Sequence, residues 1–142
     1  DSFDSTGRVE VVDGTLDFSG NDVKVGTRGT AFFTVGTNGL VKAKDMTLKN
    51  SVETVVRFTA GEAGFGTVAL SGKLSVDPGV ELVVDCGGVK PSARTLFAFG
   101  SLEGTFDDVS FVNVPPAASP RLVVSEDKVR VTGFSGSVLI VR

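Results

Sequence analysis

The stretch of sequence that decides the fold is residues 66–82, which read GTVALSGKLSVDPGVEL. Apolar side chains alternate with polar or small ones in two short runs, Val68 to Leu70 and Leu74 to Val76. A period of two residues is typical of a strand that buries one face. The runs are separated by Ser71-Gly72 and by Asp77-Pro78-Gly79, which are turn signals. The stretch therefore predicts short strands joined by tight turns.

The same pattern continues in both directions along the 142 residues. Few windows show helical periodicity, and the abundant Val, Thr and Phe favour pleated strands. We therefore predict an all-β protein with about fifteen strands of roughly three to five residues, which is shorter than usual for a sandwich. Short strands at close spacing with small polar corners favour a parallel β-helix, a β-solenoid. A β-sandwich is the alternative.

Repeated corners support the solenoid. The motif V-G-T-x-G occurs at 25–29 and again at 35–39, and an apolar-Ser-Gly corner recurs at 18–20, 70–72 and 134–136. A coil of about twenty residues places Leu48 one coil before Val68, and Leu74 one coil before Leu96.

The predicted organisation is a single β-solenoid domain over residues 1–142. Residues 1–90 are expected to form regular coils, and 91–142 a closing coil, a Pro-rich loop and a cap. Val114 to Pro120 holds three of the five prolines and cannot be a central strand. The next two runs, 121–124 and 128–131, predict a hairpin. The residues expected to share one core are Leu16, Phe18, Val68, Leu70, Leu74, Val76, Leu82, Val84, Leu96 and Phe99.

Two segments carry a family resemblance. Residues 66–82 resemble the G-T-V-x-L-S-G-x-L-x-V-x-P-G-x-x-L rung of autotransporter-type passenger domains, the autotransporter-associated β-strand repeat proteins. Residues 95–106, TLFAFGSLEGTF, are similar to the closing segment of those passengers. The resemblance covers about residues 14–133 and is most specific from Gly66 to Val131. It implies a right-handed parallel β-helix that is exported and displayed at a bacterial surface, and it assigns no catalytic residue.

Composition excludes several kinds of function. The formal net charge of −3 argues against a nucleic-acid partner, which requires a basic face. The chain has no histidine, so Ser-His-Asp and Cys-His catalysis and His-ligated zinc are excluded. Its one cysteine, Cys86, lies in a Val-rich run and is expected to be a small buried or strand-end residue. No stretch reaches 18 apolar residues, so we expect no transmembrane helix.

The candidate functional groups each have a simpler structural interpretation. Asp107 and Asp108 are adjacent and would point to opposite faces of a strand, so they would meet Asp85 only if the coils stacked them together. The glycine-rich residues 61–66 lack the features of a phosphate loop and predict a corner. A basic stripe could contain Lys42, Lys44, Lys49 and Arg57, but Asp45 and Glu53 lie among them and favour a mixed, solvated face. We expect no catalytic residue, no cofactor-binding residue, no metal ligand and no cofactor.

The sequence favours a non-catalytic, exported module of a bacterial surface or the extracellular space, such as a stalk, a passenger segment or a filament subunit. The alternative is a carbohydrate-binding or polysaccharide-processing module, which the absence of Trp and Tyr disfavours. A solenoid exposes strand edges at its ends. We therefore expect self-association by strand-edge pairing through Val9, Val11 and Val12, either with another copy or with residues 137–141 of a neighbour. A further surface or carbohydrate partner is left open.

Overall fold

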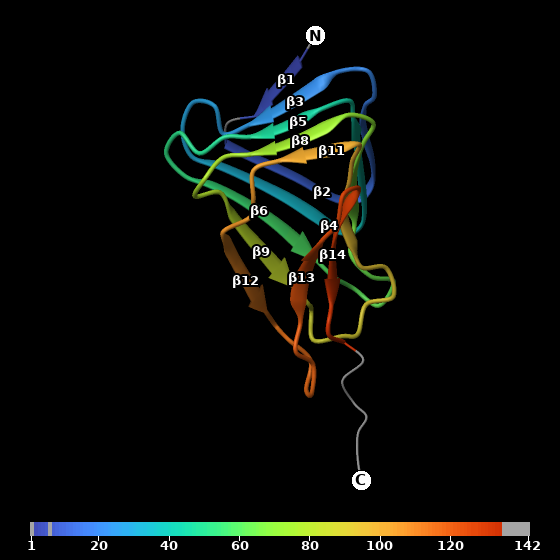
Figure 1. Cartoon of the computed structure of the whole chain (residues 1–142). Helices are drawn as coiled ribbons and strands as arrows, with labels where there is room; N and C mark the ends of the chain where they lie inside the picture. The colour runs from blue at the N-terminus through green and yellow to red at the C-terminus, as the bar shows by residue number, and fades with distance from the viewer. Residues whose placement is uncertain (1, 6, 135–142) are drawn as a thin grey trace.

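The chain folds into a β-solenoid of about four turns. The computed structural model describes residues 2–5 and 7–134, and the strand-like run expected at 137–141 lies outside these residues. Each turn of the chain passes along three sides, and strands of successive turns stack in parallel (Figure 1). The parallel pairing confirms the predicted solenoid and excludes the sandwich, whose sheets would be antiparallel.

Side 1 is a five-stranded parallel sheet. Its strands pair in the order β1 (Ser2–Ser5), β3 (Asp22–Val25), β5 (Met46–Leu48), β8 (Lys73–Val76) and β11 (Ser101–Glu103). Figure 1 shows these strands stacked in that order from the N-terminal end.

Sides 2 and 3 belong to one nine-stranded sheet that bends at a corner. Side 2 contains the first half of β2 (Gly7–Phe18), the first half of β4 (Ala31–Ala43), β6 (Thr54–Thr59), β9 (Glu81–Asp85) and β12 (Asp108–Val112). Side 3 contains the second halves of β2 and β4, β7 (Thr67–Leu70) and β10 (Thr95–Ala98). β2 and β4 run continuously through the corner and are 12 and 13 residues long, so the prediction of uniformly short strands was wrong here.

The interior is a continuous apolar column. Inward side chains of successive turns stack in register, as in the row Phe33, Val56 and Leu82 on side 2. Eight of the ten predicted core residues belong to this column: Val68, Leu70, Leu74, Val76, Leu82, Val84, Leu96 and Phe99. Leu16 and Phe18 pack against it but are half-buried, because β2 belongs to the first turn and pairs on one side with β4.

A bulge explains one departure from alternation. Leu96 and Phe97 are consecutive, yet both are fully buried. The pairing of β10 with β14 (Lys128–Thr132) shifts register between Thr95 and Phe97. A bulge of this kind lets two neighbouring side chains face the same way.

The turns are longer than the twenty residues expected. The interval between paired residues runs from 20, between Ser2 and Asp22, to 29, between Val68 and Phe97. Leu48 therefore pairs with Val76 rather than with Val68, and Leu74 with Leu102 rather than with a residue near Leu96. The expected coil of about twenty residues was too short because each turn has three sides and three corners, and the corners lengthen along the chain.

The two repeated motifs occupy the turns of the solenoid in different ways. The V-G-T-x-G copies at 25–29 and 35–39 follow β3 and the first half of β4, so they are successive corners of one turn. The Ser-Gly corners at 18–20 and 70–72 do occupy the same corner, because Phe18, Ala43 and Leu70 stack on side 3. The third copy extends to residue 136 and so falls partly outside the described residues.

A hairpin closes the C-terminal end of side 3, as expected. β13 (Arg121–Val124) and β14 pair antiparallel, and β14 pairs antiparallel with β10. The parallel stacking on sides 1 and 2 continues to β11 and β12. The Pro-rich loop joins β12 to the hairpin, with Pro115 buried.

Candidate functional site

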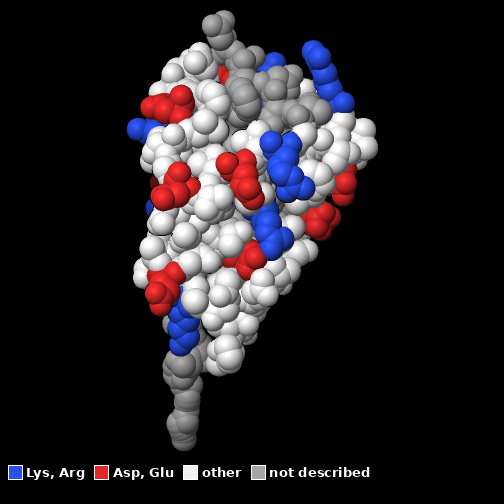
Figure 2. Space-filling model, turned by 180° about the vertical axis from the view of Figure 1, so that it is seen from behind, with Lys and Arg blue, Asp and Glu red and all other residues white. Residues whose placement is uncertain are grey.

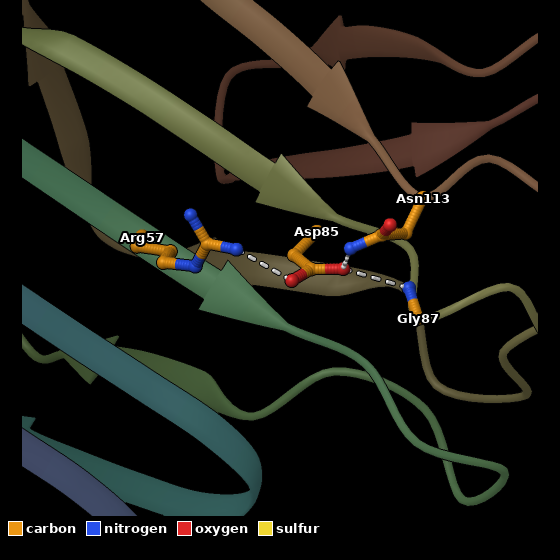
Figure 3. Close-up of polar contacts among 4 residues, drawn as sticks. All are labelled: Arg57, Asp85, Gly87 and Asn113. Atoms are coloured by element: carbon orange, nitrogen blue, oxygen red, sulfur yellow. Dashed lines mark hydrogen bonds and ion pairs between the residues drawn. The ribbon is translucent and has the colours of Figure 1, made fainter.

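A connected polar cluster is built around Asp85, at the corner between sides 2 and 3. Its carboxylate accepts hydrogen bonds from Arg57 Nη2 at 2.6 Å, from Asn113 Nδ2 at 2.9 Å and from the Gly87 backbone N–H at 2.9 Å. Figure 3 shows Arg57 and Asn113 on either side of the carboxylate. Although Asp85 points outward from the end of β9, only 7% of it is exposed. We call Arg57, Asp85, Gly87 and Asn113 the polar corner.

The polar corner joins three successive turns. Arg57 comes from β6, Asp85 from β9, and Asn113 directly follows β12. Both side-chain hydrogen bonds span 28 residues, which is close to one turn in this half of the chain. Asn113 has a φ of 52°, in the left-handed region that Asn tolerates better than most residues. The cluster therefore ties each of these turns to the next.

The electrostatics of the polar corner favour a fixed anion. Burial raises the pKa of Asp85, but the hydrogen bonds from Asn113, Gly87 and Arg57, together with the Arg57 charge, outweigh it and hold the pKa below its ordinary value of 3.8. Both carboxylate oxygens already accept hydrogen bonds. A carboxylate of low pKa with occupied oxygens is poorly suited to proton transfer near neutral pH. This arrangement stabilises the fold more readily than it performs chemistry.

The predicted acidic residues are not brought together. Asp107 and Asp108 are both exposed, and Asp107 Oδ1 accepts a hydrogen bond from Thr105 Oγ1 at 2.8 Å. Asp108 pairs with Glu81 at the start of β9, whereas Asp85 lies at the end of the same strand, about 13 Å away at 3.3 Å per residue. The neighbour of Asp108 is therefore Glu81, which sequence analysis did not single out.

The predicted basic residues are also dispersed. Lys42 is on side 3, Lys49 follows side 1, and Arg57 is on side 2, where it pairs with Asp85. Lys44 is exposed at the corner after β4. Figure 2 shows acidic and basic side chains intermingled on the back of the molecule, with uncharged surface between them. A mixed face, rather than a stripe, is what the structure contains.

Cys86 is fully buried beside the polar corner, as expected. Burial, and secondarily the charge of Asp85, raises the pKa of its thiol to about 11. A thiol of such high pKa is almost entirely protonated near neutral pH and is a poor nucleophile.

The glycine-rich loop at 61–66 is a corner, as predicted. Gly61 and Gly64 exchange backbone hydrogen bonds of 3.1 and 3.0 Å, and the Gly64 carbonyl accepts one from Thr37 Oγ1 at 2.5 Å. A Cβ on Gly66 would meet the carbonyl oxygens of Gly36 and Gly39. These contacts pack one turn against the preceding one.

The sequence contains one signal of the polar corner, which is the equal spacing of its three side-chain partners. Arg57, Asp85 and Asn113 are each 28 residues apart. The assumption of a twenty-residue coil hid this spacing, because it placed these residues in unrelated positions.

Within residues 2–5 and 7–134, no three His, Cys, Asp or Glu side chains gather as they would to hold a metal ion. The same residues include no helix of the length and apolarity needed to cross a membrane. A scan of protein-family models, a search of curated proteins and a search of solved structures each found no match to this chain.

Proposed function

We propose that the chain is a non-catalytic, exported module of a bacterial surface or the extracellular space, such as a stalk, a passenger segment or a filament subunit. The observation that carries the proposal is the polar corner. Asp85 is a buried carboxylate that is hydrogen-bonded within its own turn and to the turns before and after it, which is a contribution to rigidity along the solenoid.

Two further features support a structural role. The apolar column is continuous from β3 to β10, so the described turns form one stiff unit. The resemblance of residues 66–82 and 95–106 to autotransporter-type passengers supports export and surface display. Strand edges at the ends supply contacts to other copies, and a surface or carbohydrate partner would bind the outward side chains.

Surface display is tested in cells that express the complete natural gene. Intact cells are treated with a protease and with an antibody against this chain, and lysed cells serve as the control. The proposal expects labelling and cleavage in intact cells. Cleavage that occurs only after lysis would contradict an exported location.

The non-catalytic part of the proposal has its own test. The purified chain is incubated with pectin and related polysaccharides, and new reducing ends and unsaturated products are measured. No turnover is expected. Turnover that Asp107→Asn or Asp108→Asn abolishes would instead support the polysaccharide-processing alternative, with the substituted carboxylate as its acid or base.

A further inference from the structure

The asparagines of the chain differ in what holds their side-chain amides. Asn50 Oδ1 accepts a hydrogen bond from the Thr54 N–H at 3.1 Å, and Asn113 Nδ2 donates to Asp85 at 2.9 Å. Asn38 is exposed at the corner between sides 2 and 3, and its amide has no hydrogen-bond partner in the part of the chain that the structure describes. The Asn38 carboxamide is therefore free to change rotamer and to meet water.

The residue that follows Asn38 is Gly39, and no other asparagine of the chain precedes a glycine. The others precede residues that carry side chains, namely Asp22, Ser51 and Val114. A side chain on the following residue hinders the approach of its backbone nitrogen to the asparagine carboxamide, whereas glycine leaves this approach open. A bond from the Gly39 nitrogen to Asn38 Cγ would close an unstrained ring.

The backbone around Asn38 is paired on one side only. β4 pairs with β6 as far as Val35 and with β7 from Leu40 onward, so no ladder pair of the described residues joins 36–39 to the following turn. Towards the preceding turn, the register shifts immediately before Asn38, because residues 36 and 37 lie opposite Val12 alone. A bulge of this kind disrupts the ladder locally. The backbone at residues 38 and 39 is therefore less constrained than the middle of a strand.

We propose that Asn38-Gly39 is a site of spontaneous deamidation in the folded protein. The Gly39 nitrogen loses its proton to water and attacks Asn38 Cγ, so that an N–Cγ bond forms, the Cγ–Nδ2 bond breaks and Nδ2 leaves as ammonia. The product is a cyclic succinimide. Water then opens the ring at either carbonyl, giving aspartate or isoaspartate at position 38. The overall reaction consumes water and releases ammonia, so it needs no other reactant.

Both products place a carboxylate next to another carboxylate. Asn38 pairs with Asp13 of β2, and both residues are exposed. Like charges directly opposite each other on neighbouring strands are destabilising. Deamidation also adds one negative charge to the formal net charge of −3, so the product should separate from the natural chain by anion exchange.

Isoaspartate lengthens the main chain where space is limited. Its extra backbone carbon lies between Gly36 and Gly39. A Cβ on Gly36 would lie 2.8 Å from Val12 Cα, and a Cβ on Gly39 would meet the Val11 carbonyl oxygen. On the other side, Gly66 packs against the carbonyls of Gly36 and Gly39. The turns must therefore separate at this corner. Deamidation is a slow, irreversible way to loosen it, and the chemistry does not depend on the proposed function.

The first experiment incubates the purified 142-residue chain at mildly alkaline pH and follows its peptides by mass spectrometry. The mass increase of amide hydrolysis should appear at Asn38 before it appears at Asn21, Asn50 or Asn113. An isoaspartyl methyltransferase should label the same peptide. An unmodified Asn38, or equal rates at all the asparagines, overturns the proposal.

The second experiment asks whether the folded chain reacts. Leu82 is fully buried on side 2, two turns after β4, so Leu82→Ala raises the unfolded fraction without changing the corner at Asn38. Equal rates of deamidation in the two chains support reaction in the folded state. Acceleration in proportion to the unfolded fraction overturns it, because the reaction would then require global unfolding.

The third experiment tests the effect on the corner with two variants. Asn38→Gln is the matched control, since it keeps an exposed amide but would need a larger ring, and it should give no acidic species. Asn38→Asp carries the new charge without the extra backbone carbon. In urea unfolding, the midpoint should shift to lower urea from the natural chain to Asn38→Asp, and further for the purified isoaspartate form. An isoaspartate form as stable as the natural chain would overturn the proposed loosening.

Discussion

The corner between sides 2 and 3 is built in two different ways along the solenoid. In the first turns it is short, at 36–39, and β4 continues through it as one strand. Here Gly36 and Gly39 pack backbone against backbone with Gly66 of the following turn, and we call these three residues the glycine corner. In later turns the corner lengthens to 60–66 and then to 86–94, and the polar corner appears.

The difference shows what a longer corner requires. A short corner with glycine at both ends, Gly36 and Gly39, lets successive turns approach closely, so backbone packing contributes to holding it. A longer loop has backbone N–H and C=O groups that do not take part in the hydrogen bonds of the sheet. Side chains then bind some of these groups. The Asp85 side chain does this for the Gly87 N–H, whereas the Gly88 N–H donates to the backbone carbonyl of Asn113 at 2.6 Å.

Both corners depend on the apolar column behind them, and its truncation should have the largest effect. Leu82 is fully buried on side 2, between Val56 and Val109 in the stack. We expect Leu82→Ala to lower the free energy of unfolding by about 2–5 kcal/mol, because it removes buried methyl groups and leaves a cavity. Urea unfolding followed by circular dichroism measures this. A loss below that range would mean that the column can collapse around the cavity.

The glycine corner is tested by adding one methyl group. The Cβ of Gly66→Ala would press on the carbonyl oxygens of Gly36 and Gly39, so the turns must separate locally. We expect a loss of about 1–3 kcal/mol. Gly100→Ala is the control, since its nearest neighbour would be the Gly72 carbonyl oxygen at 3.2 Å. Equal losses in the two variants would show that close approach at the glycine corner is not what matters.

The polar corner is tested by removing its charge. Asp85→Asn loses the ion pair with Arg57 and turns an amide towards donors, so we expect a loss of about 1–2 kcal/mol at pH 7. The value is modest because the Arg57 side chain is 40% exposed and the pair is partly screened. Asp107→Asn is the control, as that carboxylate is exposed and is expected to change stability by less than about 0.5 kcal/mol.

The same variant predicts a pH dependence. The folded-state pKa of Asp85 lies below its ordinary value of 3.8, so the stability it contributes is present above pH 3.8 and is lost as the pH falls through the folded-state pKa. Melting temperatures between about pH 2.5 and 6 should therefore fall more steeply for the natural chain than for Asp85→Asn. Parallel curves would mean that Asp85 is not held ionised by its partners.

The sequence predicted the general architecture but not the arrangement of the turns. Alternation at Val68, Leu70, Leu74 and Val76 identified strands and the buried face, because each strand's pattern is local. The stacking of turns depends on the length of each corner, which varies along the chain and has no local signature. The polar corner was missed for the same reason, since Arg57, Asp85 and Asn113 become neighbours only once the turn length is known.

The smallest effect we expect is on the rate at which Cys86 is alkylated, and it tests whether the polar corner and the glycine corner open independently. Cys86 is buried next to Asp85, and its pKa of about 11 makes a native thiol nearly unreactive with alkylating reagents at pH 8. Labelling therefore reports opening of the polar corner, either locally or by global unfolding. We expect Asp85→Asn to accelerate labelling more than Gly66→Ala does, even at denaturant concentrations that equalise their global stabilities. The reason is that an amide at position 85 loses the ion pair with Arg57 and is a weaker acceptor for Asn113 and the Gly87 N–H, which hold the segment on both sides of Cys86. Gly66, in contrast, packs against an earlier turn. Equal labelling rates at equal global stability would show that the solenoid opens as one unit and that the two corners, although built differently, do not open independently.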